Sequence, residues 1–345
     1  MVGWHTAAIP IGGAVPDVVA VTGADGFIGS HLVERLVADG HRVRAMALYS
    51  AFGTRGWLDD LPADVMADVE VVSADVRDPR AVREFIADAS IVYHLAALIA
   101  IPYSYRAPQS YLDTNATGTL NVLEAARDLG TGRVVHTSTS EVYGTALRVP
   151  IDESHPLQAQ SPYAASKIAA DKLAESYHLS FDVPVVTLRP FNTYGPRQSA
   201  RAVIPTVATQ LATGGGPLHV GRLTPTRDFN HVADTIAAFV AVGSVRAERV
   251  VGRVLNAGTG VETSIADIVK LVGEILGVQP EVEPEDERMR PDASEVMRLV
   301  ADATALRDAT GWGPSVTLRE GLQGTVAWFS DPANLARYRT DRFVL

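Results

Sequence analysis

The chain has no cysteine among its 345 residues. Disulfides, thiolate nucleophiles and zinc sites built from thiolates are therefore excluded. A lack of cysteine also suits a reducing compartment, and we expect a cytoplasmic protein. No apolar run is long enough to span a bilayer. Residues 1–17 contain no lysine or arginine, so they lack the charged start of a secretory signal, and we expect a loose N-terminal extension there.

Basic residues are fewer than acidic ones, 30 against 40, which gives a formal net charge of −10. This balance disfavours a broad surface for nucleic acid or for an anionic membrane, and it leaves room for a local basic pocket that binds phosphate. Apolar residues make up 47% and charged residues 20%, as in an ordinary globular protein, which argues against large-scale disorder. The length suits a large nucleotide-binding domain and a smaller second one.

Short apolar runs alternate with amphipathic helical segments in the first part of the chain. Strands are expected at 18–21, 41–47, 69–73, 90–95, 133–137 and 185–188, and helices from 28 to the stop at Gly40 and at 81–87, 119–129 and 161–180. This alternation predicts an α/β fold, a Rossmann doubly wound parallel sheet.

After Pro190 the rhythm changes, and proline, glycine and arginine become frequent. We predict an NAD(P)-binding Rossmann domain over 18–190 and mainly a smaller substrate-binding lobe over 191–345, with some segments returning to the Rossmann domain. The lobe is expected to include the chain from about Asn256 onward. The dense charged stretch 281–290 predicts a solvated loop.

Three glycines stand between the first strand and the first helix, at Gly23, Gly26 and Gly29. Residues without a Cβ permit a tight turn, close approach of the backbone to a pyrophosphate, and packing of the helix on the strand. The helix N-terminus then offers unpaired N–H groups to the phosphates. A glycine triplet in this position indicates a dinucleotide-binding loop.

The second strand does not end in the acidic residue that often binds the ribose hydroxyls of NAD. The chain reads Ala47-Leu48-Tyr49-Ser50 there. Arg55 follows nearby and is either a partner for the 2′-phosphate of NADP or a surface residue. We expect NAD as the cofactor, and this pattern does not exclude NADP.

Tyr163 and Lys167 lie four residues apart at the start of the long helix expected at 161–180, so they share one face. Ser161 is placed as its N-cap and Pro162 at its first position. Because a tyrosine is a poor base at neutral pH, we expect the lysine ammonium and a nicotinamide cation to favour the phenolate. Tyr163 is then able to take a proton from a sugar hydroxyl as hydride leaves.

A polar segment follows the fifth strand, and Thr139, Ser140 and Glu141 lie within it. Ligands of a doubly wound sheet bind beyond the carboxyl ends of the strands. These three residues are therefore placed where the substrate should lie.

Further motifs occur in a fixed order along the chain. They are His94-Leu95-Ala96-Ala97, the segment 138–144, Ser161-Pro162-Tyr163-Ala164-Ala165-Ser166-Lys167, Arg189-Pro190-Phe191-Asn192-Thr193-Tyr194-Gly195-Pro196-Arg197, Arg227-Asp228-Phe229 and Asn256-Ala257-Gly258. With the glycine loop, they make the chain from residue 18 to about 321 similar to the extended short-chain dehydrogenase/reductase superfamily, the NAD-dependent epimerase/dehydratase family. The stretches 49–61, 98–105 and 198–205 resemble more narrowly the nucleotide-sugar 4,6-dehydratases of the legionaminic acid pathway.

The resemblance implies a nucleotide-diphosphate sugar as substrate, NAD as cofactor, no metal ion, and a homodimer formed through helices near 111–128 and 161–180. Implied cofactor contacts are Phe27, Ile28, Asp75, Val76, Leu95, Ala96, Ala97, Tyr163 and Lys167, and implied substrate contacts are Asn192, Arg201, Arg227 and Arg290. An arginine suits a diphosphate because its planar fork bonds two oxygens at once. Surface positions are the alternative for Arg201 and Arg290.

The resemblance also implies a reaction cycle. Tyr163 deprotonates the C4 hydroxyl as hydride passes to the cofactor, Glu141 removes the C5 proton, and water leaves from C6 with help from Glu141, Thr139 or Ser140. Hydride then returns to C6, which gives a 4-keto-6-deoxy sugar. A simple 4-epimerase needs no base at C5, so Glu141 favours the dehydratase.

One departure keeps alternatives open. dTDP-glucose dehydratases have an aspartate just before this glutamate, whereas this chain has Ser140, as GDP-mannose dehydratases and UDP-glucuronate decarboxylases do. The identity of the C6 acid is therefore open. An epimerase or a decarboxylase of the same fold is the alternative, and a noncatalytic dinucleotide sensor is a distant one.

Overall fold

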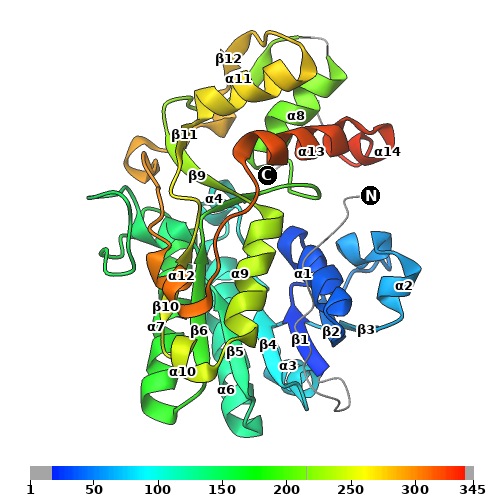
Figure 1. Ribbon diagram of the computed structural model, residues 1–345, viewed down its shortest axis with the longest axis vertical. Helices are drawn as coiled ribbons and strands as arrows, with labels where there is room; N and C mark the ends of the chain where they lie inside the picture. The colour runs from blue at the N-terminus through cyan, green and yellow to red at the C-terminus, as the bar shows by residue number, and fades with distance from the viewer. Residues whose placement is uncertain (1–17, 215, 339–345) are drawn as a thin grey trace.

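The computed structural model describes residues 18–214 and 216–338, so the extension expected at 1–17 lies outside the described residues. Figure 1 shows a central sheet with helices on both faces and a smaller lobe above the carboxyl ends of its strands. No helix in the described part of the chain is long and apolar enough to cross a membrane.

The central sheet has seven parallel strands in the order β10-β6-β5-β4-β1-β2-β3. Their bounds are β1 Val18–Thr22, β2 Arg42–Ala47, β3 Val69–Ser73, β4 Ile91–His94, β5 Arg133–Thr137, β6 Val185–Pro190 and β10 Val254–Ala257. The strand order runs outward in opposite directions from β1 and β4, which makes a crevice at their carboxyl ends, and this is where doubly wound sheets bind ligands. The predicted Rossmann fold is confirmed.

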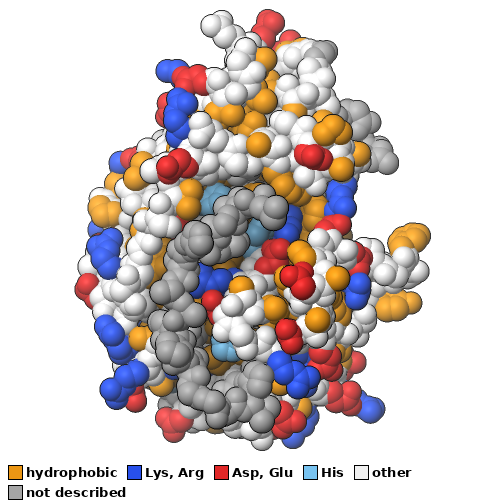
Figure 2. Space-filling view, turned by 45° about the vertical axis from the view of Figure 1, so that its right-hand side comes forward, with side chains coloured by type: hydrophobic (Ala, Val, Ile, Leu, Met, Phe, Trp, Pro, Cys, Tyr) orange, Lys and Arg blue, Asp and Glu red, His pale blue; other side chains and the backbone are white. Residues whose placement is uncertain are grey.

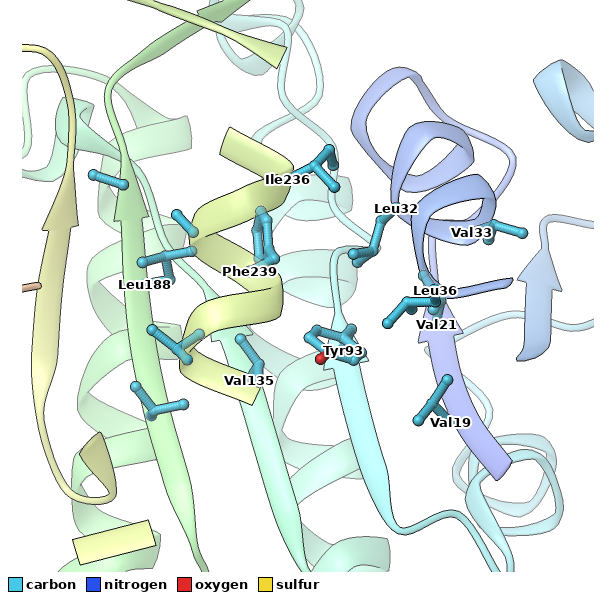
Figure 3. Packing of buried hydrophobic residues seen from close by; sticks show 14 of the residues in the cluster. Val19, Val21, Leu32, Val33, Leu36, Tyr93, Val135, Leu188, Ile236 and Phe239 are labelled. Carbon is cyan, nitrogen blue, oxygen red and sulfur yellow. The ribbon is translucent and has the colours of Figure 1, made fainter. Parts of the chain in front are cut away.

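Side chains of β1 alternate between two cores on opposite faces of the sheet. On one face, Val19 and Val21 pack against α1 and α9, where Leu32 and Phe239 are fully buried (Figure 3). On the other face, Ala20 packs into a core formed with α3, α6 and α7. The helices on the two faces are α1 Phe27–Ala38, α9 Val232–Ser244 and α12 Thr304–Thr310, and α3 Pro79–Ile86, α6 Gly118–Leu129 and α7 Pro162–Phe181.

The lobe has a separate hydrophobic core, built mainly by α8 Val203–Thr213, α11 Ile265–Leu276 and α13 Leu318–Ser330. Two small sheets accompany these helices: β7 Asn192–Tyr194, β9 Thr226–His231 and β11 Glu262–Ser264 form one, and β8 Leu218–Val220 and β12 Val282–Pro284 form the other. Figure 2 shows acidic and basic side chains interspersed over one face of the molecule.

Short helical turns complete the described chain. They are η1 Gly56–Asp60, α2 Ala63–Met66, α4 Ile101–Ser104, α5 Pro108–Tyr111, η2 Leu112–Thr117, η3 Ser140–Tyr143, α10 Ala247–Val250, η4 Asp286–Arg288, η5 Asp292–Ser294 and α14 Pro332–Leu335.

One strand of the central sheet was not predicted. Asn256, which the sequence analysis assigned to the start of a lobe segment, lies instead in β10, which pairs with β6 at the edge of the central sheet. The strand is only four residues long and includes this buried polar side chain, whose amide oxygen accepts a hydrogen bond from Tyr143. A polar residue inside so short a run hides the apolar pattern of a buried strand.

Candidate active site

A cavity of about 1290 Å³ lies between the carboxyl ends of the sheet and the lobe. It brings together every residue that the sequence assigned to chemistry or binding. From the cofactor prediction it is lined by Gly23, Gly26, Phe27, Ile28, Gly29, Asp75, Val76, Leu95, Ala96 and Ala97; from the catalytic prediction by Thr139, Ser140, Glu141, Tyr163 and Lys167; and from the substrate prediction by Asn192, Arg201, Arg227 and Arg290.

The glycine loop is shaped for close approach of another backbone. Gly23 has a φ of +67°, and a Cβ there would lie 2.8 Å from the amide nitrogen of Ala96. A Cβ at Gly29 would lie 2.1 Å from the carbonyl oxygen of Gly23. The N-cap of α1 is Gly26, which has no side chain to cap the helix. The amides of the first turn are therefore left for an anion. These features fit the pyrophosphate of a dinucleotide.

We expect a Gly29→Ala variant to lose both stability and dinucleotide affinity, because the new methyl group collides with the backbone of Gly23 and Ala24. Overpacking of this kind costs about 1–3 kcal/mol. Gly324→Ala is the matched control, since nothing lies within 4 Å of a Cβ at that position on α13. Thermal denaturation with and without dinucleotide measures both effects, and equal behaviour of the two variants would contradict the assignment of the loop.

Arg55 does not face the cavity. Its guanidinium is bound to Asp59 at 2.8 Å, its side chain is about half exposed, and it is absent from the cavity lining. Of the two readings open for this residue, the structure favours the surface one. Asp75 and Val76 do line the cavity, and Asp75 is held there by a salt bridge to Arg77.

Tyr163 and Lys167 lie in the first turns of α7, which begins at Pro162 after the predicted N-cap Ser161. Both side chains are buried, at 7% and 4% exposure, and the Lys167 ammonium donates to the carbonyl oxygen of Thr137 at 2.5 Å. Burial lowers the pKa of Lys167 to about 8, while the charge of Asp171 opposes this change.

The protein chain alone, without a nicotinamide cation, does not favour the Tyr163 phenolate. Burial raises the pKa of the Tyr163 phenol, and a hydrogen bond with Thr139 only partly offsets this increase. The nearby carboxylate of Glu141 raises the pKa further. Ionisation of Tyr163 therefore requires a positive charge beyond the groups of the protein chain.

The polar segment after β5 turns into η3 at the mouth of the sheet. Thr139 is its N-cap, and the threonine hydroxyl accepts a hydrogen bond from the amide of Glu141 at 3.2 Å. The Glu141 side chain is 12% exposed and lies 3.7 Å from the guanidinium of Arg290. This position places a carboxylate inside the cavity, where it is within reach of a bound substrate as a proton acceptor.

A buried ion network fixes the position of α7 relative to the segment that leads into η3. The carboxylate of Asp171, one turn beyond Lys167, accepts from Ser138 at 2.7 Å, from His136 at 3.0 Å and from Arg189 at 2.8 Å. Burial acts to raise the pKa of the Asp171 carboxyl, but the hydrogen bond from His136 and the charge of Arg189 lower it to about 2. Because Ser138 directly precedes the Thr139 cap, this network ties the proposed base segment to the tyrosine helix.

The far end of the cavity carries buried polar atoms that make no hydrogen bond within the described chain. The amide oxygen of Asn192 and a terminal nitrogen of Arg290 are buried without hydrogen bonds. Arg227 is 5% exposed, donates only to the carbonyl of Thr226, and its pKa is lowered by burial. Buried groups of this kind normally have a partner, so they indicate a polar or anionic ligand. Arg201 is exposed at the rim, where it donates to Ser199.

Sequence reasoning missed Arg288 and Glu295 at this end. Arg288 lines the cavity together with the predicted contact Arg290, and β12 and η4 lie within 281–290, so this stretch is not simply a solvated loop. Glu295 is 9% exposed and lies 3.7 Å from Arg227 and 3.9 Å from Arg290. No local pattern marks this glutamate, because its partners come from distant parts of the chain.

Comparisons with known proteins show the family to which the chain belongs. The family described as GDP-mannose 4,6 dehydratase matches residues 20–325. A UDP-glucose 4-epimerase of Mycolicibacterium smegmatis is 35% identical over 90% of this chain and 97% of its own length. A dTDP-glucose 4,6-dehydratase of Streptomyces antibioticus is 34% identical over 90% of this chain and 92% of its own.

Solved structures of a dehydratase and an epimerase also superpose on this chain. DesIV, a dTDP-glucose 4,6-dehydratase of Streptomyces venezuelae with NAD bound, superposes with a TM-score of 0.83 at 30% identity over 91% of this chain and 97% of its own. The UDP-glucuronic acid 4-epimerase of Bacillus cereus, in complex with UDP-glucuronic acid and NAD, has a TM-score of 0.81 at 28% identity over 90% and 98%. The similar proteins thus include both dehydratases and epimerases.

Proposed function

Since the chain belongs to the extended short-chain dehydrogenase/reductase family of nucleotide-sugar epimerases and dehydratases, we propose that it is an NAD-dependent nucleotide-sugar 4,6-dehydratase. The observation that carries the proposal is the position of Glu141. This carboxylate shares one cavity with Tyr163 and Lys167 and lies beside Arg290. A reaction confined to C4 has no use for such a base, whereas loss of water across C5 and C6 requires one.

The cofactor NAD fits the residues around the glycine loop. Gly23, Gly26 and Gly29 leave the space that its pyrophosphate needs, and the uncapped N-terminus of α1 faces its negative charge. When bound, NAD supplies the hydride acceptor for C4, the hydride donor for C6, and a positive charge beside Tyr163. Because the cycle restores the cofactor, we expect it to be held tightly.

The residues of the chain then divide the proton transfers between them. Tyr163 takes the proton of the C4 hydroxyl, and the resulting C4 ketone acidifies the hydrogen on C5. Glu141 removes the C5 proton, and the C6 hydroxyl leaves as water after protonation by Glu141, Thr139 or Ser140. The product is a 4-keto-6-deoxy sugar nucleotide.

The far end of the cavity is proposed to hold the nucleotide diphosphate. Arg227 is a buried cation, Arg290 is a partly buried one with a terminal nitrogen that makes no hydrogen bond, and Asn192 offers a buried amide oxygen. An arginine pair is well suited to the two phosphates. Arg201 contributes from the rim. The sugar is proposed to be a hexose or an N-acetylhexosamine.

A 4-epimerase is the second candidate, and the similarity to a UDP-glucose 4-epimerase at 35% identity supports it. That reaction uses Tyr163 and the cofactor but not Glu141. A UDP-glucuronate decarboxylase shares the serine at position 140 and is the third candidate.

The deciding experiment is mass spectrometry of products formed from a panel of UDP-, GDP-, dTDP- and CDP-sugars with NAD⁺. A product lighter by one water, with no net NADH, is the expected result and names the substrate. Loss of carbon dioxide from UDP-glucuronate would replace the proposal with a decarboxylase. An isomer of unchanged mass would replace it with an epimerase and remove the role given to Glu141.

A further inference from the structure

The end of β2 lacks the acidic residue that usually meets the adenosine ribose, but a carboxylate reaches the same place from the glycine loop. The Asp25 side chain accepts a hydrogen bond from the backbone amide of Leu48, the first residue after β2, at 3.1 Å. Both residues line the cavity. A carboxylate from one loop therefore stands where the sequence pattern expects a carboxylate from the next strand.

The backbone around Asp25 is fixed by its neighbours. Gly23, two residues earlier, has a φ of +67°, and Gly26, the next residue, is the N-cap of α1. The amide of Trp57 donates to the carbonyl oxygen of Asp25 at 3.0 Å. A Cβ at Gly56 would lie 2.4 Å from that oxygen, so η1 packs directly on the loop. The carboxylate is thus fixed by its surroundings and needs little ordering to bind a ligand.

The Asp25 carboxylate has spare hydrogen-bonding capacity. One oxygen accepts from Leu48, and within the described residues no cation forms a salt bridge with either oxygen. Partial burial raises the pKa of the Asp25 carboxyl, which the hydrogen bond from Leu48 opposes. A partly desolvated carboxylate without a cation gains from a hydroxyl donor and is unfavourable for a second anion.

Arginines around this end of the cavity do not offset that charge. Two guanidiniums that line the cavity each pair with a carboxylate, in the salt bridges Arg77–Asp75 and Arg337–Asp60, and Arg55, outside the cavity, pairs with Asp59. A phosphate on the ribose would compete with these carboxylates for the guanidiniums and would also lie close to Asp25. A ribose hydroxyl carries no negative charge, so it neither competes for these arginines nor is repelled by Asp25.

We propose that Asp25 accepts a hydrogen bond from the adenosine ribose and is the residue that selects NAD over NADP. The inference rests on the cofactor in the proposed function. It does not depend on the sugar substrate or on the reaction, because the selection acts on the free dinucleotide.

The test is calorimetric titration of the purified protein, freed of any co-purified cofactor, with NAD⁺ and with NADP⁺. The wild type is expected to bind NAD⁺ more tightly. In Asp25→Asn the amide oxygen can still accept from Leu48, while the charge is lost. A hydrogen bond to a charged group is worth more than one to a neutral group. The Kd for NADP⁺ divided by the Kd for NAD⁺ should therefore fall by roughly tenfold or more in this variant.

Asp64→Asn is the control, because it removes an exposed acidic charge on α2, outside the cavity, and should leave the ratio unchanged. Asp25→Ala combined with Leu48→Asp supplies a second, independent test if Asp25→Asn does not fold. Leu48 is 58% exposed, so the strand end tolerates an acid, and NAD⁺ preference should return.

A wild type that prefers NADP⁺ would overturn the inference, as would an Asp25→Asn ratio equal to that of the wild type. Failure of the dehydratase assay would leave these binding ratios untouched, so the two proposals fail separately.

Discussion

A Tyr163→Phe variant should lose about 10²–10⁴-fold of its turnover while it still binds NAD⁺, because general acid–base catalysis contributes rate enhancements of that size. The variant lacks only the phenolic oxygen. Without it, the side chain at this position has no group that could take the proton from the C4 hydroxyl. Oxidation at C4 is the first step of the cycle, so every later step depends on it.

The aromatic ring itself should stay in place. Tyr163 packs edge-on against Tyr111 with ring centroids 6.2 Å apart, and phenylalanine retains that contact. Removal of the phenolic oxygen takes away a single atom, so the void that it leaves is small. We therefore expect the Kd for NAD⁺ to stay close to that of the wild type.

The measurement is kcat with the sugar nucleotide found in the product panel, together with NAD⁺ titration of the same preparation. Tyr103→Phe is the control, since that tyrosine also lines the cavity but is 39% exposed. If Tyr163→Phe kept a turnover similar to that of Tyr103→Phe, Tyr163 would not be the base. Joint loss of turnover and cofactor binding would point to a structural defect.

Features set by neighbouring residues were predictable from the sequence. The strands expected at 69–73 and 133–137 are β3 and β5 with the same bounds, and the N-cap at Ser161 stands as expected. The glycine loop was readable because its spacing serves one turn and one helix N-terminus. All these signals lie within a few residues of the structure that they specify.

Features that depend on distant contacts were not predictable in the same way. Glu295 meets Arg227 across 68 residues of chain, and Asp25 meets Leu48 across 23. An isolated acid in a loop is usually a surface charge, so neither stands out until the fold brings its partner close. The raised pKa of Tyr163 is another such case, because burial cannot be read from the Tyr-x-x-x-Lys spacing.

A Glu141→Gln variant should separate the steps of the cycle. Glutamine has nearly the same shape but cannot accept the C5 proton, so formation of the dehydrated product should fall by about 10²–10⁴-fold. Oxidation at C4 needs Tyr163 and not Glu141, and it should continue. Reduced cofactor should then accumulate on the enzyme, visible as NADH absorbance after one substrate equivalent.

Loss of hydrogen exchange at C5 is the more direct readout. In deuterated water the wild type should incorporate deuterium at C5 of its product, because the proton removed there returns from a group that exchanges with solvent. Glu141→Gln should convert the substrate to a 4-keto intermediate that keeps its original C5 hydrogen. Mass spectrometry of the released sugar nucleotide distinguishes these outcomes.

Glu295→Gln is the matched control for charge. Glu141 and Glu295 lie 3.7 and 3.9 Å from the same guanidinium nitrogen of Arg290, so each variant removes one negative charge beside that arginine. Only Glu141 lies on η3, directly after the segment that Asp171 ties to the tyrosine helix. A similar loss in both variants would mean that the arginine needs its charge balanced and that Glu141 is no base. An unchanged turnover in Glu141→Gln would fit an epimerase, whose chemistry stops at C4.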